Sequence, residues 1–137
     1  AHGHSKNIID AVKKVKEAIS ILNSDFIRYK FDIAQVYGAL ASTYARKGWK
    51  RDAELSFKRA IKDTIDSKNE THPGLAYLYN NYAMFLDAID RKEEALEHLI
   101  KAEQILVVNG VTSDNNNLRI VRGAIIAIKN NLQKSTD

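Results

Sequence analysis

The chain has 137 residues, of which 45% are hydrophobic and 28% are charged, the balance of one folded domain rather than of a disordered segment. It has no cysteine, which excludes disulfides, thiolate metal sites and a cysteine nucleophile. The net charge is +4, and residues 1–62 carry 13 Lys and Arg against 6 Asp and Glu. We interpret most of these cations as the solvated faces of amphipathic helices.

The first five residues, AHGHS, resemble a cloning or tag remnant, so we expect the fold to cover residues 6–137 and to be a piece of a longer protein. Residues 6–22 predict an amphipathic helix, because apolar residues recur there at helical spacing with lysines opposite. The stretch 23–31 is expected to link this helix to the next one.

Further segments carry helical periodicity, and no convincing strand interrupts them. They are residues 32–47, 50–67, 71–89, 90–109 and 118–132. Gly48 is expected to end the first of these. Thr71 is a candidate N-cap with Pro73 in the first turn, and Asp90 with Glu93 has the spacing of a capping box.

The same order of residue types occurs twice, at a constant offset of 42 residues. The first set is Tyr37, Leu40, Ala41, Tyr44, Ala53, Phe57 and Ala60; the second is Tyr79, Tyr82, Ala83, Leu86, Ala95, Leu99 and Ala102. Small residues alternating with large ones are typical of antiparallel helix pairs. The chain therefore divides into a half repeat (6–31), two repeats (32–68 and 71–110) and a terminal helix (114–133).

This order resembles the tetratricopeptide repeat, which carries an aromatic or Leu, Leu-Gly/Ala and Tyr on its first helix and Ala, Phe and Ala on its second. His72-Pro73 and the run Tyr79-Asn80-Asn81-Tyr82-Ala83, with the long period, are similar to the kinesin-light-chain type. The family's usual period is about 34 residues and its closing Pro is absent here. The resemblance covers residues 8–132 and implies an all-α, right-handed α-solenoid of antiparallel helix pairs.

The resemblance also implies a non-enzymatic scaffold that holds a partner's peptide in a concave groove. The expected groove residues are Gln35, Ser42, Arg46, Tyr77, Asn80, Asn81, Met84, Arg119 and Arg122. An Asn side chain can both donate to and accept from a peptide backbone, and Arg can hold carboxylates. We therefore expect a protein or peptide partner, with acidic residues as one option.

Two alternatives stay open: a regulatory or sensor domain of a signalling or transcription-related protein, and nucleic-acid binding through the basic first half, which we favour less. A carboxylate clamp for acidic C-terminal tails is not expected. Gly38, Ser42 and Gly123 stand where that clamp needs Lys, Asn and a basic residue.

No enzymatic constellation, cofactor or metal site is expected. Glu94 and His98 have the i, i+4 spacing of metal ligands, but without a second such pair we interpret them as surface groups. The isoleucines of the last helix, including Ile126, predict packing on a further repeat or on a second copy. No apolar run approaches the roughly 20 residues of a membrane span, so we expect a cytoplasmic protein with no membrane partner.

Overall fold

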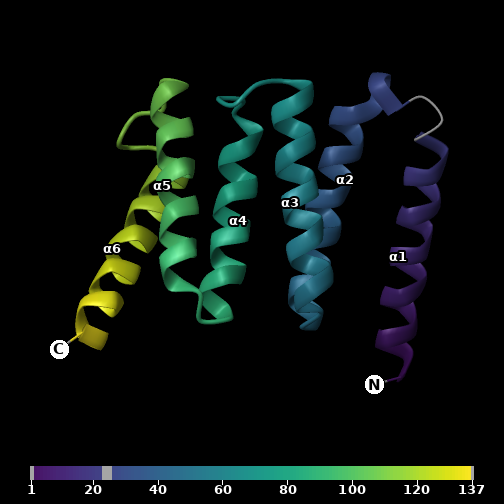
Figure 1. Cartoon of the computed structure of the whole chain (residues 1–137), viewed down its shortest axis with the longest axis horizontal. Coiled ribbons are helices and arrows are strands. Elements are labelled where there is room, and N and C mark those ends of the chain that lie inside the picture. The colour runs from purple at the N-terminus through teal and green to yellow at the C-terminus, as the bar shows by residue number, and fades with distance from the viewer. Residues whose placement is uncertain (1, 23–25, 137) are drawn as a thin grey trace. The chain divides into compact units, whose positions relative to one another are not determined.

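The computed structural model describes the backbone of residues 2–22 and 26–136 and the side chains of residues 6–21 and 28–134. Within these ranges the chain forms helices and no strand (Figure 1), which confirms the predicted all-α class. The helices are α1 (His2–Leu22), α2 (Phe26–Lys47), α3 (Lys50–Ser67), α4 (Gly74–Ala88), α5 (Lys92–Val108) and α6 (Asn116–Thr136). None of these described helices is long and apolar enough to cross a membrane.

The chain divides into two compact units between Ser67 and Lys68, where the two sequence repeats meet. In the first unit α1 packs on α2 and α2 packs on α3; in the second, α4 packs on α5 and α5 on α6. Within each unit, helices that follow one another in sequence are therefore neighbours, which is compatible with a helical-repeat fold.

The core of the first unit lies between the antiparallel helices α2 and α3 (Figure 1). Ala41, Ala53 and Ala60 are fully buried there, and Tyr44 and Phe57 fill the space beside them. A methyl side chain at the contact lets the two backbones approach, and the aromatic rings then occupy the remaining volume.

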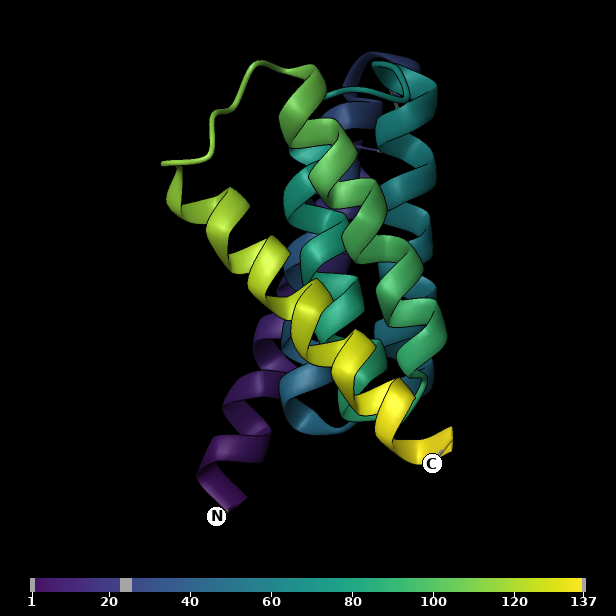
Figure 2. The ribbon, with the colours of Figure 1, turned by 90° about the vertical axis from the view of Figure 1, so that its left-hand side faces the viewer.

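The second unit repeats this arrangement between α4 and α5. Ala83, Ala95 and Ala102 are fully buried, with Leu86 and Leu99 packed beside them. Helix α6 crosses α5 obliquely (Figure 2). The buried residues of α6 are Leu118, Val121, Ile125 and Ile128.

Helices α2 and α4 end in the same kind of turn. Gly48 has a φ of 77°, and the backbone N–H of Trp49 donates to the carbonyl of Tyr44 at 3.0 Å. In the second repeat Asp90 has a φ of 63° and the N–H of Arg91 donates to the carbonyl of Leu86 at 2.8 Å. This is the Schellman pattern, in which a left-handed residue closes the helix.

The capping box predicted at Asp90 is therefore wrong. Asp90 ends α4 rather than beginning α5, whose N-cap is Arg91 without a side-chain capping bond. Thr71 is not the cap of α4 either, because its N–H and hydroxyl both donate to the side-chain oxygen of Asn69, at 2.9 and 3.0 Å. Pro73 holds the N-cap position, and Nδ1 of His72 accepts the N–H of Gly74 at 3.1 Å.

The expected boundaries of the first two helices also need correction. Helix α1 begins at His2, so it includes residues assigned to a tag remnant, and α2 begins at Phe26 rather than at residue 32. The run 26–31 contains no Gly or Pro, so nothing local stops the helix. Residues 23–25 of the expected link lie outside the described residues.

The expected apolar stripe of α1 is only partly buried. Val12 and Ile19 are buried, whereas Ala11 and Ala18 are exposed. Their counterparts 42 residues later, Ala53 and Ala60, are fully buried. Helix α1 therefore lacks, in the first unit, the paired helix that covers these positions in the repeats.

Candidate functional site

Helices α4, α5 and α6 surround a hollow of about 170 Å³ in the second unit. We call it the α4–α6 hollow. It is lined by Pro73, Ala76, Tyr77 and Asn80 at the start of α4, Leu106 of α5, and Asn117, Ile120 and Val121 of α6. Its walls are thus largely apolar, with two amide side chains.

The helical period of α4 explains why these side chains reach the hollow. Tyr79, Tyr82 and Leu86 are buried in the core with α5. Residues three or four apart share a face, so Tyr77 and Met84 lie together on the other side of the helix and are 67% and 61% exposed. Asn80 stands between them on the flank that meets α6.

The side chain of Asn80 carries a buried polar atom that lacks a hydrogen bond among the described residues. This atom is the side-chain oxygen Oδ1, whereas the Nδ2 of the same amide donates to the sulfur of Met84 at 3.9 Å. A buried acceptor without a donor costs free energy, about 1–3 kcal/mol in typical cases. Because χ2 of Asn is soft, this amide can turn to meet a donor placed in the hollow.

The α6 side of the hollow was only partly anticipated. Ile120 is 58% exposed beside it, and Asn117 stands one turn earlier. Asn117 precedes the helical segment expected from residue 118 onward, and the isoleucines of α6 were expected to pack on a further repeat or on a second copy. The spacing of Asn117, Ile120 and Val121 is that of one helix face and was the signal that could have identified them.

The two arginines expected in the groove do not line the hollow. Arg122 lies two residues from Ile120, on nearly the opposite side of α6, and its Nε donates to Oε2 of Glu103 at 2.9 Å. Arg119 is exposed on α6. Asn81, on α4, is partly buried and is also absent from the lining.

The remaining expected groove residues belong to the first unit. Gln35 and Arg46 are exposed on α2, and Ser42 is partly exposed between them. Nη2 of Arg46 donates to the hydroxyl of Thr43 at 3.5 Å. Gly38 of the same helix, which stands where a carboxylate clamp needs Lys, is buried.

Behind the hollow, α4 and α5 hold an aromatic cluster. Burial raises the pKa of the Tyr79 hydroxyl, and the negative charge of Glu70 adds to that rise. The Lys101 ammonium lies 5.6 Å from the centre of the Tyr79 ring, and the His98 ring meets Tyr82 edge-on at 4.7 Å. Because these rings pack in the core face of α4, they stiffen the helix that carries Tyr77 and Asn80.

The Glu94–His98 pair is engaged in other contacts. The Glu94 carboxylate pairs with Arg91, and Nδ1 of His98 lies 2.8 Å from the backbone oxygen of Glu94. In the described part of the chain no group of three or more His, Asp or Glu side chains is placed to hold a metal ion.

A scan against protein-family models and a search of curated proteins found no match to this chain.

Proposed function

We propose that this chain is a tetratricopeptide-type repeat scaffold, of the long kinesin-light-chain-like period, that binds an extended peptide segment of a partner protein without catalysing a reaction. The 42-residue repeat and the helix pairs built on it support the assignment of the repeat type. The absence of cysteine is consistent with a cytoplasmic location, which we include in the proposal.

The observation that carries the proposal is the unsatisfied oxygen of Asn80 in the wall of an apolar hollow. An extended peptide offers a backbone N–H to such an acceptor and, one residue away, an apolar side chain to the hollow. Tyr77 and Ile120 are exposed on either side, so the side chain would be enclosed by apolar surface that is now in water.

The size of the hollow favours a side chain over a small-molecule ligand. Its volume of about 170 Å³ is below the roughly 300–1,000 Å³ of sites that bury a drug-sized ligand. One Leu, Met or Phe side chain suits it better. Arg119, one residue from Ile120, is exposed and makes no ion pair among the described residues, so it can attract an acidic residue next to that anchor.

A library of displayed peptides, selected against the intact chain, tests this proposal. We expect the selected peptides to share one large apolar residue. The variant Tyr77→Ala, Asn80→Ala should weaken their binding at least about 10-fold in calorimetric titrations, the effect of about 1.4 kcal/mol. The matched control Arg122→Ala should bind them as the wild type does. Equal affinity of the hollow variant and the wild type would rule out this site.

A further inference from the structure

The turn between α2 and α3 concentrates cations that form no ion pair within the part of the chain that the structure describes. Residues 46–51 read Arg-Lys-Gly-Trp-Lys-Arg, and we call this segment the basic turn. Arg46, Lys50 and Arg51 are exposed and Lys47 is partly exposed. Among the described residues, no carboxylate forms an ion pair with any of the four, although other cations of the same unit, such as Lys58 with Glu54, are paired.

The second repeat shows that this charge is not a requirement of the turn. The corresponding turn has the same backbone geometry, with Asp90 in place of Gly48. Its two cations are neutralised, Arg91 by Glu94 and Lys92 by Asp87 at 2.6 Å. The fold therefore accepts a turn whose charges are neutralised. The Schellman geometry of the first repeat does not require the cations that form no ion pair among the described residues.

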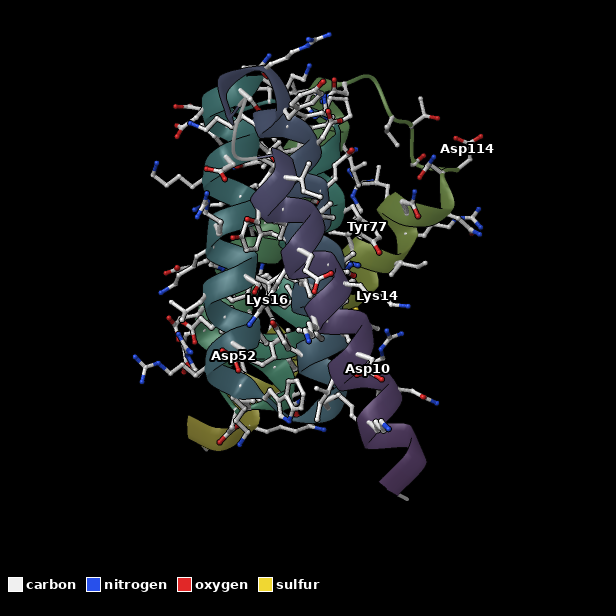
Figure 3. All side chains as sticks on the ribbon, turned by 90° about the vertical axis from the view of Figure 1, so that its right-hand side faces the viewer. Asp10, Lys14, Lys16, Asp52, Tyr77 and Asp114 are labelled. Carbon is white, nitrogen blue, oxygen red and sulfur yellow. The ribbon has the colours of Figure 1, made fainter. Side chains whose placement is uncertain are left out.

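Helix α1 extends the basic surface. Lys16 lines a hollow of the first unit together with Tyr44 and Asp52, and α1 begins at the same end of the unit as the basic turn (Figures 1 and 3). Lys13 and Lys14 are exposed on the neighbouring turn of the helix. Asp10, Glu17 and Asp52 are the carboxylates closest in sequence to these seven cations, and they leave a clear positive excess.

Trp49 adds an aromatic ring at the centre of these charges. Its ring packs on Tyr44 at 5.6 Å between centroids, and it is partly exposed. Cations that follow a phosphate backbone, with an aromatic ring on which a base can stack, are the usual combination in proteins that bind single-stranded nucleic acids. Arginine forks also hold phosphate oxygens in two-point contacts.

We propose that the basic turn, Arg46, Lys47, Lys50 and Arg51 around Trp49, binds the phosphate backbone of a single-stranded nucleic acid. An anionic membrane surface fits less well, because the turn offers no apolar side chain besides Trp49 for insertion. An acidic peptide fits less well, because the turn has no amide side chain that could pair with a peptide backbone. The site lies on α2 and α3 and does not depend on the α4–α6 hollow.

The test is fluorescence anisotropy with a labelled oligouridine of about 12 nucleotides, a length within the range that single-strand binders cover. Salt is varied from about 0.05 to 0.2 M, because each phosphate contact contributes a slope of about −0.7 in log K against log salt. The variant Lys50→Glu, Arg51→Glu should lose two contacts, which flattens the slope by about 1.4 and weakens binding about 25-fold at about 0.1 M salt.

The control Lys129→Glu, Lys134→Glu changes the net charge by the same amount at two exposed cations of α6. This control should bind the oligonucleotide as the wild type does. In the wild type and in the control, the bound strand should quench the fluorescence of Trp49, the single tryptophan. Equal loss in both variants would mean that only net charge matters, which overturns the proposal. So would tighter binding to polyglutamate or to phosphatidylserine vesicles than to the oligonucleotide.

Discussion

Asp90 occupies the left-handed backbone conformation that Gly48 occupies 42 residues earlier, with φ values of 63° and 77°. Both residues follow the first helix of a repeat and allow the next N–H to reach back to that helix. Glycine takes this conformation without strain, whereas an L-residue with a Cβ pays about 1–2 kcal/mol. The second repeat thus keeps the turn of the first at a conformational cost.

Replacing Asp90 with Gly should stabilise the chain by up to about 1 kcal/mol, because it removes that strain. Gly48→Ala should destabilise it by about 1 kcal/mol through backbone conformation alone, since a Cβ at Gly48 meets no atom within 4 Å. Urea unfolding followed by circular dichroism measures both. A stabilised Gly48→Ala variant would contradict this explanation.

Ala60 and Ala18 stand at corresponding positions of the repeat but differ in burial. Ala60→Leu should destabilise the chain by about 1–3 kcal/mol, because a larger side chain cannot fit between α2 and α3. Ala18→Leu, on the exposed face of α1, should change stability by less than about 0.5 kcal/mol. Denaturant titrations should therefore give clearly different free energies of unfolding for the two variants. An equal loss of stability in both would mean that α1 is covered at Ala18.

Arg59 and Asp63 form an ion pair whose two side chains differ strongly in burial. Their Nε–Oδ2 distance is 2.6 Å, and the side chains are 40% and 3% exposed. The hydrogen bond to Asp63 raises the pKa of the Arg59 guanidinium, which also lies 4.9 Å from the Tyr37 ring centre. Arg59→Met leaves a buried carboxylate unpaired and should cost about 3–5 kcal/mol.

Asp63→Asn should cost less, about 1 kcal/mol, since the amide oxygen still accepts from Arg59 and the arginine reaches solvent. Comparing the free energies of unfolding at neutral pH checks this order. If Asp63→Asn proved the more damaging change, the burial of Asp63 would not be what makes the pair unequal.

Asp66 confers a pH-dependent part of the stability of the first unit. Hydrogen bonds from Lys62 at 3.0 Å and Lys30 at 3.3 Å lower the pKa of its carboxyl below the ordinary 3.8. The ionised form is therefore favoured by folding, so its contribution is present above that value and is lost as pH falls through the folded pKa. Asp66→Asn should lower the Tm at pH 7 and leave it unchanged near pH 2, as scanning calorimetry at both pH values would show.

Variants of Ile128 and Ile126 distinguish packing within the second unit from association through the exposed face of α6. Ile128 is 5% exposed and Ile126 is 60% exposed. Ile128→Glu should destabilise the second unit by more than about 2 kcal/mol, because it places a carboxylate in the α5–α6 contact. Ile126→Glu should leave stability unchanged and reduce any concentration-dependent association in sedimentation. Association that persists in Ile126→Glu would exclude this face of α6 as the contact.

The repeat pattern predicted the core well because burial between helices restricts residue size. Ala53, Ala60, Ala95 and Ala102 were identified from their spacing, and all are fully buried. The ends of the helices were harder to predict from the sequence. The Asp90–Glu93 spacing satisfies a capping box and also fits a Schellman turn, and only the φ of Asp90 distinguishes the two.

The candidate site was predictable only in part. The spacing along α4 predicted that Tyr77, Asn80 and Met84 share one face. This prediction needs only the period of a single helix and no knowledge of the other helices. Whether Arg122 or Ile120 faces that helix depends on how α6 is rotated on α5, and both orientations bury apolar residues. The choice follows from packing between distant segments, which the helical period of α6 alone does not determine.

The contact between Trp49 and Tyr44 has a practical consequence for studying how the two repeats fold. Trp49 is the single tryptophan and lies in the first unit, whereas helices of both units contribute to the circular dichroism signal. Unfolding curves from the two signals will coincide if the units melt as one cooperative block. Separate curves would show a partly folded intermediate in which one helical hairpin has unfolded and the other is still folded. Such an intermediate is expected for a linear array of repeats.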